Sequence, residues 1–230
     1  MTAFVLGATG FVGREVVRQL CVRATPVVAH VRPDSMQLQD WRKRFAKLGA
    51  TIDTSPWDAE TLALGLDKAR ATELYILIGT TRGRAKADGV DGDIYERIDY
   101  GLTKIAVAAA KAMQGDKPRL IYLSGLGADA DARGAYMRAR GKAEDAVRNS
   151  GLPWAIARPA IITGERDESR MGERAAAVIG DGILAVAAVF GGKRLQQRYK
   201  STTPDVLAAA LIRLAESPEH DRIADGSELR

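Results

Sequence analysis

Short apolar runs alternate with stretches of helical periodicity from one end of this 230-residue chain to the other. The first apolar run, residues 3–6, ends in glycine, and apolar residues then repeat at helical spacing over residues 11–20. A short continuous apolar run is typical of a strand that is buried on both faces of a parallel sheet. About six such alternations predict an α/β fold with a doubly wound parallel sheet, since right-handed crossovers place helices on both faces.

The expected elements follow from these runs and from the residues that end them. We expect strands at residues 3–6, 26–31, 51–54, 73–78, 120–123 and 154–157. We expect helices at residues 11–20, 37–48, 59–69, 98–113, 135–149, 204–216 and, in part, 171–190. Residues 79–93 lack periodicity and predict a loop. The chain has no linker-like stretch, so residues 1–230 are predicted to form a single domain, with a small substrate-side segment at residues 159–203.

Composition excludes several classes of protein. One cysteine cannot form an internal disulfide, and two histidines with that cysteine do not make a typical zinc site, so we expect no metal. The formal net charge of +5 suits an anionic cofactor. No basic block or aromatic–basic pattern accompanies this charge, so we expect no nucleic-acid partner.

The location is inferred from features that the sequence lacks. No apolar run approaches the roughly 20 residues that span a bilayer. No positively charged stretch precedes the first apolar run, as it would in a signal peptide. We therefore expect a cytoplasmic protein that does not associate with a membrane.

Three glycines follow the first strand and open the first helix with the spacing G-x-x-G-x-x-G. The pyrophosphate of a dinucleotide must lie against backbone N–H groups at a helix N-terminus, where side chains at the first two glycines would obstruct it. The third glycine lets the helix pack closely on the strand. A turn without a ligand is the alternative, which the strand–turn–helix context makes less favourable. The predicted cofactor-binding residues of this turn are Gly7, Thr9, Gly10, Phe11, Val12 and Gly13.

The end of the second strand decides which dinucleotide binds. An acidic residue there would hold a ribose 2′-hydroxyl, whereas an arginine favours a 2′-phosphate. Arg32 occupies this place, and its planar fork suits phosphate, so the sequence predicts NADP(H) rather than NAD(H). Two alternatives stay open: Arg32 is a solvated surface residue, or Asp34 is the ribose ligand.

Taken together, the motifs resemble those of a known family. The chain is similar to the atypical short-chain dehydrogenase/reductases, in particular the NmrA-like and Tat-interacting-protein-like NAD(P)-binding proteins. The resemblance covers most of the chain and is weaker over residues 166–200. It rests on the glycine turn, Gly79-Thr80-Thr81-Arg82-Gly83, Asp99-Tyr100, Tyr122-Leu123-Ser124, Tyr136 with Arg140-Gly141-Lys142-Ala143-Glu144, and Arg158-Pro159.

This resemblance implies further site residues. Asp58 falls where the family meets the adenine amino group, although a helix N-cap is an equally good interpretation. The remaining cofactor-binding residues that it implies are Gly79, Thr80 and Thr81 near the adenosine ribose, Tyr136, and Pro159 and Ile161 beside the nicotinamide carboxamide. The family's catalytic Ser-Tyr-Lys group falls on Ser124, Tyr136 and Arg140.

Arg140 departs from the family's pattern, which has lysine at that position. A tyrosine that exchanges protons near neutral pH needs a nearby cation, since the pKa of free tyrosine is about 10. Four residues advance a helix to within roughly 40° of the starting direction, so position 140 lies on the same side as Tyr136. Arginine can supply the charge but not a compact ammonium between tyrosine and ribose. Ser124 before Gly125 is also ordinary turn chemistry.

Two functions follow from these residues. The first is an NADP(H)-dependent oxidoreductase that acts on a small carbonyl or similar acceptor, with Tyr136 as general acid, Ser124 orienting the substrate and Arg140 tuning the tyrosine. The second is a redox sensor or regulator that binds NADP(H) without turnover, which Arg140 favours. Residues 175–190 are apolar on much of their circumference and either cover the cleft or form a homodimer contact.

Overall fold

The computed structural model describes residues 1–80, 92–160, 162–163 and 201–230. Its strands are β1 (Ala3–Leu6), β2 (Val27–His30), β3 (Thr51–Asp53), β4 (Glu73–Ile76), β5 (Arg119–Leu123), β6 (Trp154–Arg158) and β7 (Arg222–Asp225). Its helices are α1 (Phe11–Val22), α2 (Leu38–Leu48), α3 (Ala59–Ala69), the π-helix η1 (Tyr95–Leu102), α5 (Thr103–Ala112), α6 (Ala135–Arg148), α9 (Pro204–Glu216) and the 3-10 helix η2 (Gly226–Leu229).

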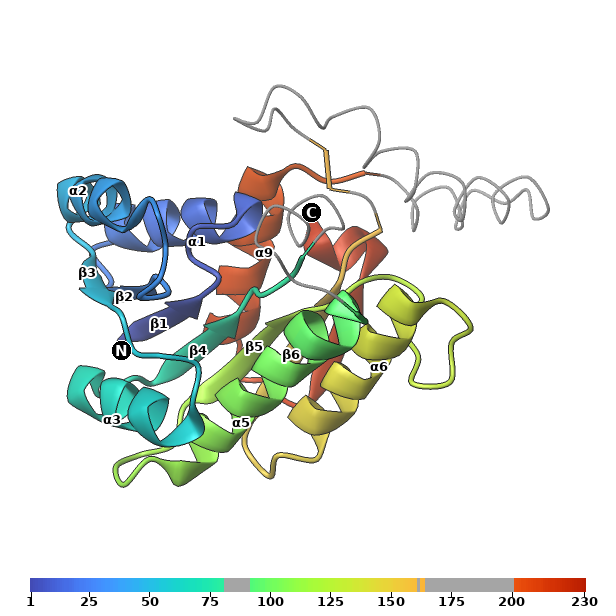
Figure 1. Ribbon diagram of the computed structural model, residues 1–230. Coiled ribbons are helices and arrows are strands. Elements are labelled where there is room, and N and C mark those ends of the chain that lie inside the picture. Colours follow the sequence, from blue (N-terminus) through green and yellow to red (C-terminus); the bar gives the residue numbers. More distant parts are fainter. Residues whose placement is uncertain (81–91, 161, 164–200) are drawn as a thin grey trace.

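The seven strands form one parallel sheet in the order β3-β2-β1-β4-β5-β6-β7 (Figure 1). The predicted α/β doubly wound fold is therefore confirmed. The chain order reverses between β1 and β4, and ligands of such sheets bind at this point, outside the carboxyl ends of the strands. The register pairs Leu6 with Ile76, so the turn after β1 lies beside the end of β4.

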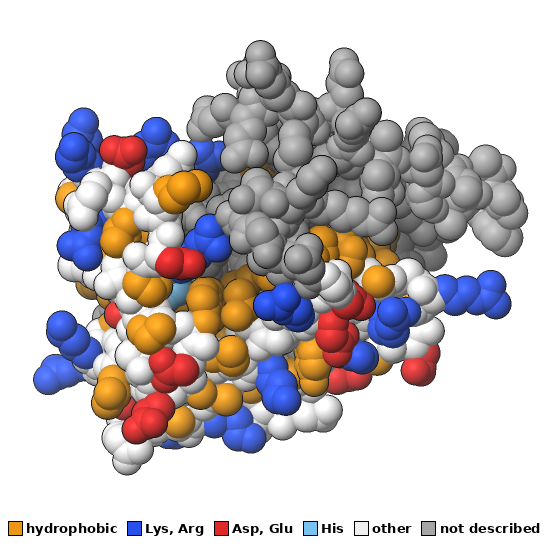
Figure 2. Space-filling model, in the orientation of Figure 1, with side chains coloured by type: hydrophobic (Ala, Val, Ile, Leu, Met, Phe, Trp, Pro, Cys, Tyr) orange, Lys and Arg blue, Asp and Glu red, His pale blue; other side chains and the backbone are white. Residues whose placement is uncertain are grey.

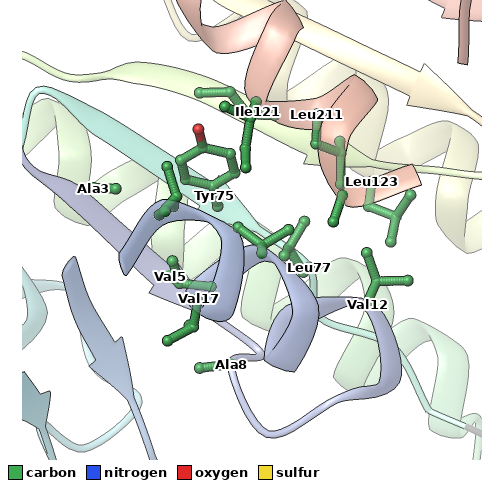
Figure 3. Close-up of a cluster of buried hydrophobic side chains, with 14 of the residues drawn as sticks. Ala3, Val5, Ala8, Val12, Val17, Tyr75, Leu77, Ile121, Leu123 and Leu211 are labelled. Carbon is green, nitrogen blue, oxygen red and sulfur yellow. The ribbon is translucent and has the colours of Figure 1, made fainter. Parts of the chain in front are cut away.

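Alternate residues of each strand enter two separate cores. On β1, Ala3 and Val5 pack against α1, α2 and α9, whereas Phe4 and Leu6 pack with the buried residues of α3, α5 and α6. Figure 3 shows part of the first of these cores, which contains Tyr75 of β4 and Ile121 of β5. Because both faces are covered, the strands read as continuous apolar runs, which is the pattern that revealed them.

The strand β7 was not expected from the sequence. Arg222–Asp225 contains only two apolar residues, Ile223 and Ala224, between charged ones. It lies at the edge of the sheet, where β6 alone pairs with it. An edge strand with one strand neighbour needs fewer apolar residues than a central strand, so the apolar-run criterion missed it.

The expected long helix over residues 98–113 is two consecutive elements, η1 and α5. The first is a π-helix, a geometry that is rare and frequently found at functional sites. It carries Asp99, which is fully buried. The expected helix at residues 171–190, and with it the proposed cleft cover or dimer contact at residues 175–190, lies outside the described residues.

Candidate functional site

The predicted site residues lie after the carboxyl ends of successive strands. Gly7 follows β1, Arg32 follows β2, Asp58 follows β3, Gly79 follows β4, and Ser124 follows β5. Since all strands run the same way, these positions share one edge of the sheet. Figure 2 shows that basic and acidic side chains are interspersed over the face in view, without a single block of one sign.

The glycine turn is packed too tightly for side chains. Gly7 has a φ of +77°, and a Cβ there would lie 2.5 Å from the Leu77 carbonyl oxygen at the end of β4. A Cβ on Gly13 would lie 2.9 Å from the Ala8 Cα and closer still to the Gly7 carbonyl oxygen. The first and third glycines therefore let strand, turn and helix approach one another at the point where the sheet order reverses.

The N-terminus of α1 suits a phosphate group. Gly10 is its N-cap and makes no side-chain capping bond, and its first turn contains no acidic residue. The backbone N–H groups of a helix's first turn and the positive end of the helix dipole favour an anion at such a place. The turn is thus compatible with the pyrophosphate of a dinucleotide, and the predicted contacts of Gly7, Gly10 and Gly13, with Thr9, Phe11 and Val12 between them, stay a prediction.

Arg32 lies two residues beyond the end of β2, with 38% of its side chain exposed. Its Nε lies 3.6 Å from Oδ1 of Asp34, which is largely exposed. Exposed pairs of this kind contribute little to stability, so the pair does not prevent Arg32 from turning to a ligand. The structure places both candidate ribose ligands together at this edge.

Asp58 is the N-cap of α3, which was the alternative to its role at adenine. Its carboxylate accepts a hydrogen bond from the Thr61 backbone N–H at 2.8 Å. This bond lowers the pKa of the Asp58 carboxyl. The side chain is exposed, and the predicted contact with adenine stays a prediction.

The residues after β4 contact a buried ion pair. Arg140 Nη2 lies 2.8 Å from Oδ1 of Asp99, and a Cβ on Gly79 would lie 2.5 Å from the same nitrogen. Burial raises the pKa of the Asp99 carboxyl to about 6, although Arg140 and the Thr80 backbone N–H both lower it. A side chain at position 79 would therefore collide with the Arg140 guanidinium, which explains the glycine there. Thr81, predicted with Gly79 and Thr80, lies outside the described residues.

Arg140 connects three elements around this pair. Its Nη1 donates to the Leu123 carbonyl oxygen at 2.7 Å and to the Tyr122 hydroxyl at 3.2 Å, both on β5. Burial lowers the pKa of the guanidinium, but Tyr122, Tyr136 and Asp99 raise it well above its ordinary value, so it is charged. Position 140 thus binds the ends of β4 and β5 to η1 and α6, rather than presenting an extended side chain to solvent.

Tyr136 lies beside Arg140, as the helical spacing predicts. The guanidinium carbon of Arg140 is 5.3 Å from the centre of the Tyr136 ring, within the range of a cation–π contact. The Tyr95 ring of η1 packs edge-on against it, with ring centres 5.3 Å apart. The Tyr136 hydroxyl faces the start of the turn after β5, where a Cβ on Gly125 would lie 3.8 Å away.

Ser124 is hydrogen-bonded to a buried carboxylate. Its hydroxyl donates to Oε1 of Glu144 at 2.6 Å, and Arg158 forms an ion pair with the same carboxylate. Glu144 is fully buried. Over the described ranges, no hydrogen bond joins Ser124 to Tyr136. Its predicted role in orienting a substrate stays a prediction and would require release of the hydroxyl from Glu144.

Two remaining positions lie after β6. The Pro159 carbonyl oxygen accepts from the Leu126 backbone N–H at 2.9 Å, which joins the ends of β5 and β6. Ile161 lies outside the described residues, so its predicted place beside the carboxamide stays a prediction.

Residue-by-residue interpretation of the sequence missed the charged groups beneath the site. Asp99, Glu144 and Arg158 belonged to recognised motifs but were assigned no role. A signal was present, because Tyr136, Arg140 and Glu144 are spaced four residues apart and so occupy one face of α6. Charged residues on the sheet-facing side of a helix are rarely buried without partners. Here Arg140 pairs with Asp99, and Glu144 pairs with Arg158.

The described part of the chain contains no group of three or more His, Cys, Asp or Glu residues placed to hold a metal ion. None of its helices combines the length and the apolar character that crossing a membrane requires.

Comparison with known proteins agrees with the class that this fold and edge define. Residues 7–215 match the model of the NAD(P)H-binding family, and the chain belongs to that family. It is 30% identical over 186 residues to protein FMP52, mitochondrial, of Candida albicans, covering 79% of this chain and 76% of the relative. It is 32% identical over 230 residues to protein fmp52-1, mitochondrial, of Aspergillus terreus, covering 97% and 90%.

Solved structures share the fold. A putative epimerase from Burkholderia cenocepacia superposes with a TM-score of 0.67 at 18% identity, covering 99% of this chain and 78% of that one. Yeast methylglyoxal/isovaleraldehyde reductase Gre2, complexed with NADPH, superposes with a TM-score of 0.68 at 13% identity, covering 98% and 78%. The family match confirms the predicted resemblance to NAD(P)-binding proteins, and these neighbours show that the fold is shared with epimerases and reductases.

One expectation from the sequence is corrected by these comparisons. The curated relatives are named as mitochondrial proteins, which overturns the expected cytoplasmic location. That expectation rested on the lack of a membrane-spanning run and of a signal peptide, and neither lack identifies a compartment.

Proposed function

We propose that this protein is an NADP(H)-dependent oxidoreductase that reduces a small carbonyl or similar acceptor. The observation that carries the proposal is Tyr136, whose hydroxyl faces the turn after β5 at the cofactor edge of the sheet. Bound nicotinamide would supply or accept hydride there. The glycine turn would bind the pyrophosphate, and Arg32 would bind the 2′-phosphate.

Tyr136 is the proton donor in this proposal. Its ring packs against Tyr95 and Arg140. Because the side chain is only half-buried, its hydroxyl can reach an acceptor oxygen. Arg140 is a positioning residue, because it holds the ends of β4 and β5 around the tyrosine through Asp99, Tyr122 and the Leu123 carbonyl. The NADPH complex of the structurally similar Gre2 reductase supports the choice of cofactor and reaction type.

A second candidate function is an NADP(H) sensor without turnover. Two observations favour it: the guanidinium of Arg140 is committed to Asp99, Tyr122 and Leu123, and the Ser124 hydroxyl is committed to Glu144. A sensor needs only the cofactor-binding half of the edge, which these contacts leave intact.

Substituting Tyr136 separates the two functions. We expect Tyr136→Phe to lower NADPH-dependent reduction of aldehydes by about a hundredfold, because general acid catalysis contributes on this scale. NADPH affinity, measured by calorimetry, should change little. Tyr95→Phe is the matched control, since it removes a hydroxyl from the neighbouring ring, and it should keep full turnover. Full turnover by Tyr136→Phe would exclude Tyr136 as the donor, and tight NADPH binding with no turnover by any form would favour the sensor.

A further inference from the structure

The turn after β5 presents two adjacent positions to two different parts of α6. Ser124 is 4% exposed, and its hydroxyl is bound to Glu144. The next residue, Gly125, faces the Tyr136 hydroxyl. Glu144 and Tyr136 are eight residues apart on α6, which separates their backbone positions by about 12 Å along the helix. The serine and the glycine therefore serve two distinct places.

The Ser124 side belongs to a closed polar cluster. Glu144 accepts the Ser124 hydroxyl through Oε1, and the same oxygen accepts Arg158 Nε at 2.8 Å. Arg158 also pairs with Oε2 of Glu144. Removing a hydrogen-bond donor from a buried carboxylate lowers the stability of the fold, so the Ser124 hydroxyl stays bound to Glu144. This cluster ties the end of β5 to β6 and α6.

The Gly125 side is open to an added group. Gly125 does not have a positive φ, so a side chain is compatible with its backbone. Among the described residues, the nearest atom that a Cβ there would meet is the Tyr136 hydroxyl oxygen, at the ordinary contact distance of 3.8 Å. One further atom on that Cβ could approach the Tyr136 hydroxyl to within hydrogen-bond reach.

We propose that position 125, not position 124, is the place from which a second hydroxyl would act beside Tyr136, and that the turn after β5 offers no such hydroxyl because Ser124 is bound to Glu144 and residue 125 is glycine. This inference rests on the proposed oxidoreductase function. The site then favours acceptors whose reduction needs a single proton donor. We therefore expect the natural protein to reduce simple aldehydes, whose developing oxyanion gains from two donors, more slowly than a variant that carries a second donor.

The experiment compares Gly125→Ser with Gly125→Ala, which adds the same Cβ without the hydroxyl. With NADPH and benzaldehyde, we expect Gly125→Ser to raise kcat by about tenfold over the natural protein, since donors to a developing oxyanion act on at least this scale. Gly125→Ala should give no such rise. Ser124→Ala should lower the Tm, because Glu144 loses a donor, and should reduce turnover per folded molecule less than Tyr136→Phe does.

Two outcomes would overturn the inference. One is a Ser124→Ala protein that keeps its Tm and NADPH affinity but loses turnover as severely as Tyr136→Phe. The other is an equal change in kcat in Gly125→Ser and Gly125→Ala. If no form reduces any acceptor, the oxidoreductase proposal itself fails, and a crystal structure of Gly125→Ser decides the inference separately. A hydrogen bond from the introduced hydroxyl to Tyr136 supports it, and a hydroxyl turned away contradicts it.

Discussion

Replacing Gly13 with alanine is expected to lower the free energy of unfolding by about 3 kcal/mol and to abolish measurable NADPH binding. The new Cβ would lie 2.9 Å from the Ala8 Cα and closer still to the Gly7 carbonyl oxygen. Both atoms belong to the backbone of the turn, so α1 must move away from β1 to make room. Chemical denaturation and calorimetric titration with NADPH measure the two losses.

Gly134→Ala is the matched control for this substitution. Gly134 precedes α6, has a φ of −76°, and a Cβ there meets nothing within 4 Å. Because Gly134 is the N-cap of α6 and alanine is the poorer cap, we expect a loss of about 0.5–1 kcal/mol, well below that of Gly13→Ala. If Gly13→Ala were as stable as this control and bound NADPH normally, the close approach of α1 to the turn would not be required.

Replacing Arg140 with methionine is expected to destabilise the fold by about 3–5 kcal/mol at neutral pH, because it leaves a buried carboxylate without its cation. Asp99 is fully buried and lies 2.8 Å from the guanidinium. Lys142→Met is the matched control on the same helix. Lys142 pairs with Glu96 at 2.9 Å, but both side chains are 38% exposed, so we expect a loss of about 1 kcal/mol or less.

The loss from Arg140→Met also depends on pH, with a definite sign. Burial already raises the pKa of Asp99 to about 6, and removing Arg140, which lowers that pKa, raises it further. The folded variant therefore binds a proton more tightly than the unfolded chain does, and its stability increases as the pH falls through this pKa. Denaturation below pH 6 should show a smaller difference from the natural protein than denaturation at neutral pH. A difference that is constant with pH would show that the lost interaction is not with the Asp99 carboxylate.

Much of the fold was predictable because strands that are buried on both faces of the sheet appear in the sequence as continuous apolar runs. Strands such as Ala3–Leu6 and Trp154–Arg158 appear as short apolar runs, and α1 appears at helical spacing. The strand Arg222–Asp225 could not be found this way, because its position at the sheet edge removes the need for an apolar run. The π-helix was missed since its apolar spacing merges with that of α5.

The candidate site was predictable where it depends on backbone geometry and less so where it depends on packing. The glycine turn follows from the need for a close approach, and its contacts agree. The proximity of Arg140 and Tyr136 follows from the helical period. The commitment of Ser124 to Glu144, and of Arg140 to Asp99, depends on which elements pack together in three dimensions. No local spacing in the sequence encodes these partners.

We propose that the edge around the glycine turn binds a dinucleotide and that Arg32 selects NADP(H) over NAD(H). Calorimetric titration of the natural protein and of Arg32→Ala with NADPH and with NADH tests it most directly. We expect the natural protein to bind NADPH at least about tenfold more tightly, a preference of about 1.4 kcal/mol, and Arg32→Ala to lose most of it. Tighter binding of NADH by the natural protein would contradict the role of Arg32 and move the ribose contact to Asp34. Failure to bind either dinucleotide would contradict both the dinucleotide site at the glycine turn and the role of Arg32.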